Sequence, residues 1–226
     1  MKINQDKARK SFKALYKHES ENEGKEETVW LMISTFENNA LINRNPAKIL
    51  LKHGCYTPGV RRCLFVRASQ QAYKDKIKEK KIKGIHKVID LKHLKKQYSK
   101  SDAQLQLMED FDMFLADNYT IHKLRKILCK EVYKKRREPI PIDLKGKDLQ
   151  KEVLLTAKST YMNFTKGSCY AVKIATTGQT DVAAFENLMF AYKKIALATP
   201  GGEDAIRSLQ IKTANSISLP IYEHNE

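Results

Sequence analysis

Cysteine is scarce in this sequence, and its four cysteines include no C-x-x-C pair of the kind that zinc sites use. No apolar run approaches the roughly 20 residues of a membrane-spanning helix, and residues 1–10 are polar and charged rather than a signal sequence. These absences predict a soluble, intracellular protein that holds no metal, contacts no membrane and forms no disulfide. Cys63 and Cys169 lie in apolar, strand-like runs and are expected to be buried.

Motifs of catalysis and cofactor binding are missing as well. The sequence has no Walker-type phosphate loop and no G-x-S-x-G elbow. A methyltransferase is disfavoured because residues 67–70, after the first strand of the central block, carry no glycine. A metal-dependent nuclease is disfavoured because three of its four candidate acids, Glu109, Asp110, Asp112 and Asp117, flank a buried strand, where acids commonly cap the ends. We therefore predict no enzymatic activity, no cofactor and no small-molecule substrate.

Positive charge is abundant. The 226 residues include 42 lysines and arginines against 26 aspartates and glutamates, a formal net charge of +16, and 42% of the residues are hydrophobic. The hydrophobic content is enough for one large domain or two modest ones, which argues against global disorder. The charge surplus favours an anionic partner, which is a nucleic acid, an anionic membrane surface or an acidic protein.

The periodicity of apolar residues divides the chain into two terminal segments and a central block. The N-terminal segment predicts a helix over 6–17, a strand over 28–33, a turn over 43–46 and a strand over 47–51. The C-terminal segment predicts an extended linker over 139–142, a helix over 148–164, a strand over 170–174, a helix over 181–198 and a last strand-like segment over 211–222. The two ends together predict one α+β domain.

The central block alternates strands with helices. Its strands are predicted at 63–66, 86–89 and 111–116, and its helices at 70–81, 91–98, 102–109 and 121–133. Such alternation predicts a parallel sheet with right-handed crossovers, which is a Rossmann-like arrangement. The predicted fold is therefore α/β: a discontinuous α+β domain I from residues 1–60 and 140–226, with a Rossmann-like α/β domain II inserted at 61–139.

This organisation, with these residues, resembles the ribosomal protein L1 family, which includes the large-subunit stalk protein and eukaryotic ribosome-assembly relatives. The segments that carry the resemblance are 27–29, 46–53, 111–117, 124–129, 139–142 and, most closely, 212–222. One departure is informative, because Asn215-Ser216-Ile217 stands where the ribosomal protein typically has a Met-Gly-Pro turn. This variant is similar to the assembly-factor branch of the family, which occurs in nucleolar pre-ribosomes.

In this family, domain I contacts RNA through the terminal strand loop and its neighbours. The resemblance implies RNA contacts from Thr28, Lys212, Thr213, Asn215 and Ser216, and from Lys25, where relatives often have an aromatic residue. Short polar side chains, Ser218 among them, also allow a backbone to approach a sugar-phosphate surface closely, although such a run is typical of an edge strand too. Independently of the family, three cations on predicted domain I elements are candidates to neutralise phosphates: Arg44, Lys48 and Lys173.

Two basic clusters lie outside domain I. The first lies along the opening helix of domain II and just past its end, and it is equally well interpreted as a solvated helix face: Lys74, Lys76, Lys78, Lys80, Lys81 and Lys83. The second, Lys134, Lys135, Arg136 and Arg137, precedes the proline-rich linker, and its four cations repel one another unless an anion is present. We expect this second cluster to contact RNA or to serve as a nuclear-localisation signal.

Together these features predict a non-enzymatic protein that binds pre-rRNA and assists ribosome assembly in the nucleolus, beside other assembly factors or ribosomal proteins. The short C-terminus at Glu226, which carries no tail, favours the small-subunit precursor over the large-subunit precursor. Two alternatives stay open: a large-subunit ribosomal protein that binds mature rRNA, and a protein–protein adaptor that binds acidic partners.

Overall fold

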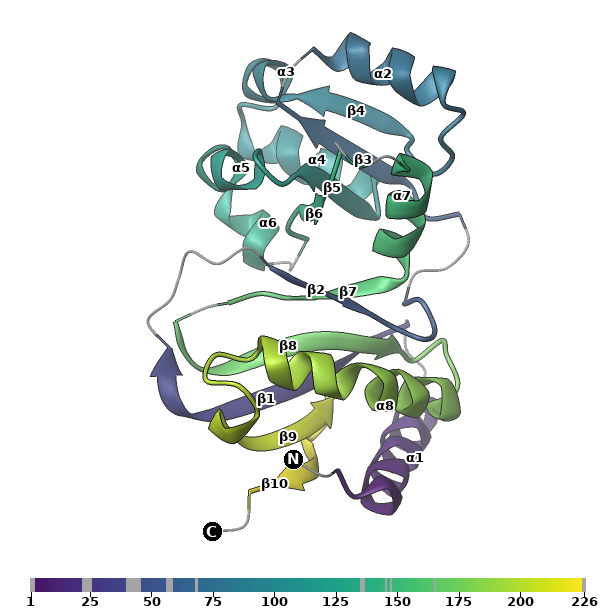
Figure 1. Cartoon of the computed structure of the whole chain (residues 1–226), viewed down its shortest axis with the longest axis vertical. Helices are drawn as coiled ribbons and strands as arrows, with labels where there is room; N and C mark the ends of the chain where they lie inside the picture. Colours follow the sequence, from purple (N-terminus) through teal and green to yellow (C-terminus); the bar gives the residue numbers. More distant parts are fainter. Residues whose placement is uncertain are drawn as a thin grey trace. The chain divides into compact units, whose positions relative to one another are not determined.

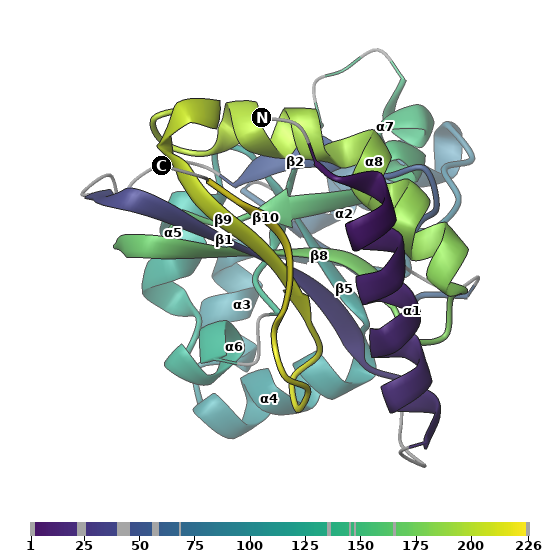
Figure 2. The same cartoon turned by 90° about the horizontal axis from the view of Figure 1, so that it is seen from below.

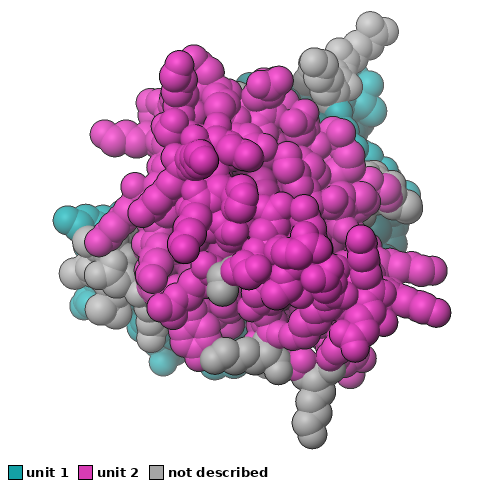
Figure 3. Space-filling model, turned by 90° about the horizontal axis from the view of Figure 1, so that it is seen from above, with its two compact units in different colours: residues 1–55, 156–226 teal, residues 56–155 magenta. Residues whose placement is uncertain are grey.

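The computed structural model describes residues 3–21, 26–39, 46–55, 59–67, 69–134, 137–144, 146, 148–164 and 166–224. The chain folds into two compact units, which are coloured separately in Figure 3. Unit 1 comprises residues 1–55 and 156–226, and unit 2 comprises residues 56–155. Unit 2 is therefore an insertion between the two halves of unit 1.

A four-stranded antiparallel sheet forms the centre of unit 1 (Figure 1). Its strands are β1 (Thr28–Asn39), β8 (Gly167–Thr176), β9 (Ile206–Lys212) and β10 (Leu219–Glu223), in the order β10-β9-β1-β8. The helices α1 (Gln5–Glu21) and α8 (Asp181–Ala198) pack against it, and a short 3₁₀ helix, η1 (Glu203–Ala205), precedes β9. Because β1 pairs with strands from the other end of the chain, neither half of unit 1 completes the sheet alone.

The alternation of side chains along β1 separates the two faces of this sheet. Val29, Leu31 and Ile33 are fully buried, whereas Trp30 and Met32 between them are half-buried. The buried face packs against α1 and α8, which lie on the same side of the sheet (Figures 1 and 2). We call the opposite surface of the sheet, which α1 and α8 do not cover, the open face.

A two-stranded antiparallel ribbon completes unit 1. It pairs β2 (Ala47–Leu50) with β7 (Ser159–Met162), and Ile49 and Met162 extend the core beneath α8. The predicted helix over 148–164 is therefore only half correct, because the observed helix α7 (Leu149–Ala157) ends before β7. Thr160 and Tyr161 favour an extended backbone, and their pairing partner β2 lies far away in the sequence.

Unit 2 is built on a parallel sheet with helices on both faces. Its strands are β3 (Arg62–Val66), β4 (Lys87–Asp90), β5 (Met113–Asp117) and β6 (Ile140–Ile142), in the order β4-β3-β5-β6. Its helices are α2 (Gln70–Glu79), α3 (Leu91–Gln97), α4 (Ser101–Asp110), α5 (Ile121–Ile127), α6 (Lys130–Lys134) and most of α7. Two separate apolar clusters bury the two faces, so the strands are apolar on both sides. The α/β fold class predicted from the sequence is confirmed.

The return from unit 2 to unit 1 comes later in the chain than the sequence indicated. Residues 140–142 form β6 beside β5 rather than an extended linker. The next 13 residues also belong to unit 2, which ends at residue 155, because Ile142, Leu149 and Val153 pack in the same cluster as Leu64 and Leu115. The second half of unit 1 therefore begins at residue 156, whereas the sequence predicted that the second half of domain I begins at residue 140.

The predicted helix over 121–133 is broken into α5 and α6. Leu128 adopts an extended backbone, with φ −75° and ψ 142°. Gln104 of α4 pairs with backbone groups on either side of the break. Its Nε2 donates to the carbonyl of Ile127 at 3.1 Å, and its Oε1 accepts from the N–H of Cys129 at 2.7 Å. Apolar spacing alone does not reveal this interruption, because the group that stabilises it comes from another helix.

Two expectations about the strands of unit 1 are corrected. The last strand-like segment, 211–222, is the hairpin of β9 and β10, with a loop over residues 213–218 (Figure 2). Cys63 is buried as expected, but Cys169 is exposed. Cys169 lies on the edge strand β8 opposite Ser34, on the open face, where alternation directs it away from the core.

Candidate nucleic-acid interface

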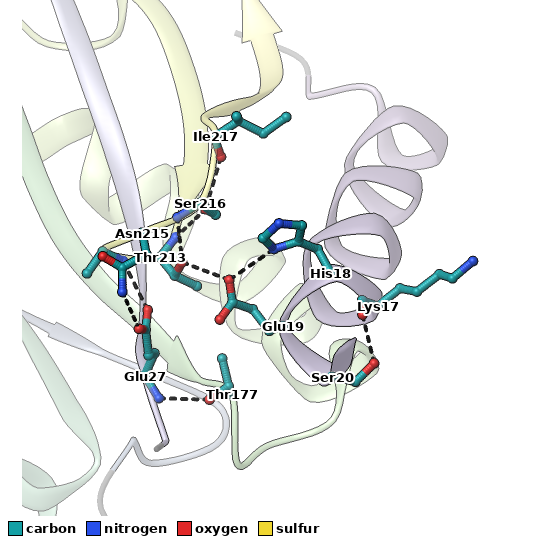
Figure 4. Close-up of polar contacts among 11 residues, drawn as sticks. Lys17, His18, Glu19, Ser20, Glu27, Thr177, Thr213, Asn215, Ser216 and Ile217 are labelled. Carbon is teal, nitrogen blue, oxygen red and sulfur yellow. Dashed lines mark hydrogen bonds and ion pairs between the residues drawn. The ribbon is translucent and has the colours of Figure 1, made fainter. Parts of the chain in front are cut away.

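Four of the predicted RNA contacts, Thr213, Asn215, Ser216 and Ser218, lie in the hairpin loop. Hydroxyl groups hold its turn (Figure 4). The N–H of Thr213 donates to Ser216 Oγ at 2.9 Å, and the N–H of Ser216 donates to Thr213 Oγ1 at 3.1 Å. Both residues are buried, with 0% and 8% of their surface exposed. Short hydroxyl side chains commonly satisfy turns in this way. The two hydroxyls therefore shape the loop.

Two carboxylates bind the loop from neighbouring elements (Figure 4). Glu19, near the end of α1, accepts a hydrogen bond from Thr213 Oγ1 at 3.0 Å. Glu27, immediately before β1, accepts from Asn215 Nδ2 at 2.9 Å and from the N–H of Ala214 at 3.3 Å. Because a carboxylate repels a phosphate, this part of the loop is poorly suited to a direct phosphate contact.

Two of the predicted lysines come together on the open face. Lys212 of β9 and Lys173 of β8 are both direct antiparallel partners of Trp30 in β1, so they flank it on either side. A register shift between Val29 and Trp30 brings Lys173 into this position, as bulges do when they redirect a side chain. Directly opposed residues point to the same face with Cβ atoms about 5 Å apart. The open face therefore gathers one indole between two cations.

Thr28 and Ser218 lie near this group but not in it. Thr28 begins β1 and pairs with Thr176 of β8. Ser218 is exposed, and its hydroxyl donates to Gln210 Oε1 at 2.6 Å. Gln210 is the direct partner of Met32, the next residue along the open face after Trp30. One hydrogen bond between side chains therefore connects the hairpin loop to the open face.

The other three candidates of domain I are not part of this arrangement. Lys48 lies on β2, outside the four-stranded sheet, and its Nζ donates to Thr156 Oγ1 at 3.2 Å. Lys25 and Arg44 lie outside the described residues.

The basic cluster that precedes the linker does not act as one unit. Arg137 Nη1 donates to the carbonyls of Met108 at 2.8 Å and Phe111 at 3.2 Å, at the end of α4. Lys134 is the last residue of α6, and the two cations between Lys134 and Arg137 lie outside the described residues. Arg137 thus satisfies carbonyl groups at a helix C-terminus.

Charge is divided unevenly between the two units. Residues 56–155 contain 25 lysines and arginines against 13 aspartates and glutamates, a net charge of +12. The remaining residues contain 17 against 13, a net charge of +4. Six of the exposed cations of unit 2 lie on α3 and α5: Lys92, Lys95, Lys96, Lys123, Arg125 and Lys126. The basic cluster predicted around α2 contains further exposed cations: Lys78, Lys80, Lys81 and Lys83.

The sequence analysis missed the functional candidate Trp30 and the two carboxylates that hold the loop. Residues 28–33 are apolar enough to suggest burial on both sides, so the half-buried position of Trp30 was not evident. A stricter use of strand alternation would have assigned Trp30 and Met32 to the face opposite Val29 and Leu31. No local signal identifies Glu19 and Glu27 as partners of a loop nearly two hundred residues later.

Other kinds of site find no support in the described part of the chain. No group of three or more His, Cys, Asp or Glu side chains there is placed to hold a metal ion, and no described helix is long and apolar enough to cross a membrane. Burial raises the pKa of the Cys55 thiol to about 11 and that of Cys63 to about 12. These two thiols are protonated at neutral pH, so they are poor nucleophiles.

Comparison with known proteins identifies the family. The model of the ribosomal protein L1p/L10e family matches residues 15–217. A protein of Schizosaccharomyces pombe, named as a ribosome biogenesis protein, is 33% identical over 210 residues, which cover 88% of this chain and 55% of the relative. Ribosomal L1 domain-containing protein 1 of Mus musculus is 26% identical over 183 residues, covering 77% of this chain and 40% of that protein. The chain thus spans about half the length of these two relatives. The family match covers elements of both units, and the chain belongs to the ribosomal protein L1p/L10e family.

Proposed function

We propose that this chain is a non-enzymatic ribosome assembly factor that binds pre-rRNA. The proposal is supported by the family and by the names of relatives, two of which, from Schizosaccharomyces pombe, are called ribosome biogenesis proteins. The observation that carries it is the surplus of 16 positive charges, which the carboxylates of the chain are too few to neutralise. A polyanion such as rRNA provides the missing negative charge.

The two units would contribute differently to RNA binding. The cations of unit 2 would neutralise phosphates without regard to sequence, which supplies affinity and makes it dependent on salt. The open face and the hairpin of unit 1 would supply shape, because a sheet surface and a rigid loop hold their side chains in fixed positions. This mechanism requires binding alone and breaks no bond. The proposed location is the nucleolus, and the proposed partners are pre-rRNA and other assembly factors or ribosomal proteins.

Crosslinking of the tagged full chain to RNA in cells, followed by sequencing of the recovered fragments, tests this function. Enrichment of external-spacer or small-subunit precursor RNA would assign the chain to the small-subunit precursor, and enrichment of the second internal spacer to the large-subunit precursor. Reads confined to mature stalk rRNA would indicate a ribosomal protein instead. No enrichment of rRNA over background would overturn the proposal and favour an adaptor for acidic proteins.

Two matched variants make this experiment specific. The unit 2 cation variant replaces with glutamine the six exposed cations Lys92, Lys95, Lys96, Lys123, Arg125 and Lys126. The unit 1 cation variant removes the same charge from exposed lysines of α1 and α8: Lys7, Lys10, Lys13, Lys17, Lys193 and Lys194. We expect the unit 2 variant to lose most crosslinks and the unit 1 variant to retain them.

A further inference from the structure

The open face combines features that recur where proteins bind single-stranded nucleic acids. Such surfaces join cations, which follow the phosphate backbone, with an aromatic ring on which a base stacks. Trp30, Lys173 and Lys212 provide both groups on three adjacent strands. The strands that hold them are central or paired on both sides, except for β8, so the three side chains are held in a fixed relation.

The neighbours of this group on the open face are uncharged. Along β1, the next position on the open face is Met32, whose direct partners are Ala171 and Gln210. These five positions around Trp30 therefore include two cations, two uncharged side chains of moderate size and one methyl group, and no carboxylate. All of them are half-buried, as expected for the solvent side of a sheet. A short apolar and polar surface of this kind admits the flat face of a base and the adjacent sugar.

The carboxylates at the loop limit where the phosphates of a bound RNA strand can lie. Glu19 and Glu27 lie beside residues 213–215, at the end of the sheet where Lys212 ends β9. Their charge disfavours a phosphate at the loop but not at Lys173, which lies on the other side of Trp30. A phosphate is therefore favoured at Lys173 and disfavoured beside residues 213–215.

We propose that Trp30, Lys173 and Lys212 form a binding site for an unpaired base of RNA, which stacks on the indole while the lysines neutralise the flanking phosphates. This inference rests on the proposed RNA-binding function and specifies the part of the RNA that unit 1 recognises. It predicts a preference for single-stranded over double-stranded RNA at this site, because a base inside a duplex is stacked on its neighbours and cannot reach the ring.

The chain contains one tryptophan, so its fluorescence reports on the site directly. We would titrate the full chain with a single-stranded RNA of about 12 nucleotides and follow tryptophan emission together with the anisotropy of a label on the RNA. A duplex of the same sequence and an oligoglutamate peptide are titrated separately as controls. We expect the single strand to quench the tryptophan emission with the same midpoint as the anisotropy change. The duplex and the peptide should quench the emission only weakly.

Substitutions distinguish stacking from simple packing. Trp30→Leu should weaken binding of the single strand about 10-fold, whereas Trp30→Phe, which keeps an aromatic ring, should restore most of the affinity. Lys173→Gln and Lys212→Gln should each reduce the slope of log affinity against log salt by about 0.7. Circular dichroism melting of each variant shows whether the fold is intact, and the lysine variants test the site without altering the ring.

The outcomes separate this inference from the proposed function. If RNA binds with unchanged tryptophan emission and Trp30→Leu binds as well as the unaltered chain, the site is wrong, although RNA binding stands. Equal quenching by the duplex or by oligoglutamate would also overturn it. If no RNA raises the anisotropy, both the site and the proposed function fail.

Discussion

The two units of this protein differ in how they expose their sheets and how they carry charge. Unit 1 covers one face of an antiparallel sheet and leaves the other open, with a net charge of +4. Unit 2 covers both faces of a parallel sheet and carries +12, with exposed cations on its helices. Charge on helices supplies affinity for any polyanion, whereas an open sheet face with fixed side chains suits selective contacts. Under the proposed function, affinity and selectivity would therefore come from different parts of one chain.

The interiors of the two units share one device, a buried amide that pairs with backbone groups of an irregular segment. In unit 1, Asn187 Oδ1 accepts from the N–H of His53, and its Nδ2 donates to the carbonyls of His53 and Ile174. In unit 2, Gln104 bonds the carbonyls of two residues and the N–H of Cys129. Each amide therefore satisfies three backbone groups that regular structure leaves unpaired.

Replacement of either amide by leucine should produce the largest loss of stability. Asn187→Leu and Gln104→Leu should each lower the free energy of unfolding by about 3 kcal/mol, because buried backbone groups lose their partners. Urea denaturation measures the loss, and hydrogen exchange shows which unit is affected. We expect each variant to lose protection in its own unit. Equal loss of protection throughout the chain would show that the two units unfold together rather than separately.

Removal of cations should affect RNA affinity more in unit 2 than in unit 1. The unit 2 cation variant should bind RNA about 100-fold more weakly at ~0.15 M salt and show a shallower salt dependence, because fewer counterions are released. The unit 1 cation variant should lose less than about 10-fold. Fluorescence anisotropy at several salt concentrations measures both. Equal losses would mean that net charge matters and its location does not.

The hairpin loop should depend on the buried hydroxyl of Thr213. Thr213→Val should lower the free energy of unfolding by about 2 kcal/mol, because the N–H of Ser216 and the carboxylate of Glu19 each lose a partner. Ser218→Ala removes an exposed hydroxyl and should change the free energy of unfolding by less than about 0.5 kcal/mol. Chemical denaturation compares the two. A neutral Thr213→Val would contradict a structural role for this side chain.

The smallest expected effect is a pH dependence in unit 1. Hydrogen bonds from His53 and Lys52 lower the pKa of Glu186 below its ordinary value. The folded state therefore holds the ionised carboxylate more strongly, and this stabilisation is complete above the ordinary glutamate pKa and is lost as the pH falls through the lower folded pKa. The melting temperature of Glu186→Gln should differ from that of the unaltered chain at neutral pH and converge with it in acid. A constant difference would show that the ion pair makes no pH-dependent contribution.

Elements that are periodic and self-contained were predictable from the sequence. The predicted helix over 181–198 has the observed bounds of α8, because its caps and apolar stripe are local. The predicted helices over 121–133 and 148–164 were only partly correct, because a glutamine from α4 stabilises a break in the first and pairing with β2 converts the end of the second into a strand. Contacts distant in sequence decided both cases.

The candidate site shows the same division. Lys173 and Lys212 were identified from charge and family resemblance, and the structure places them together. Trp30 was not identified, because an apolar strand does not reveal which face lacks a covering layer. Thr213 and Ser216 were identified as RNA contacts, yet their hydroxyls are bonded within the loop. Whether they contact RNA stays a prediction.

By itself, the sequence determined the family, the α/β class and the positive charge, because motifs, periodicity and composition are carried by residues near one another or by simple counts. The tertiary structure decided which strand face stays open, which cations flank Trp30 and which carboxylates hold the loop. The physical reason is that these relations join β1 and α1 to strands from the opposite end of the chain. Pairing register and helix packing, rather than local propensity, set the positions of those groups.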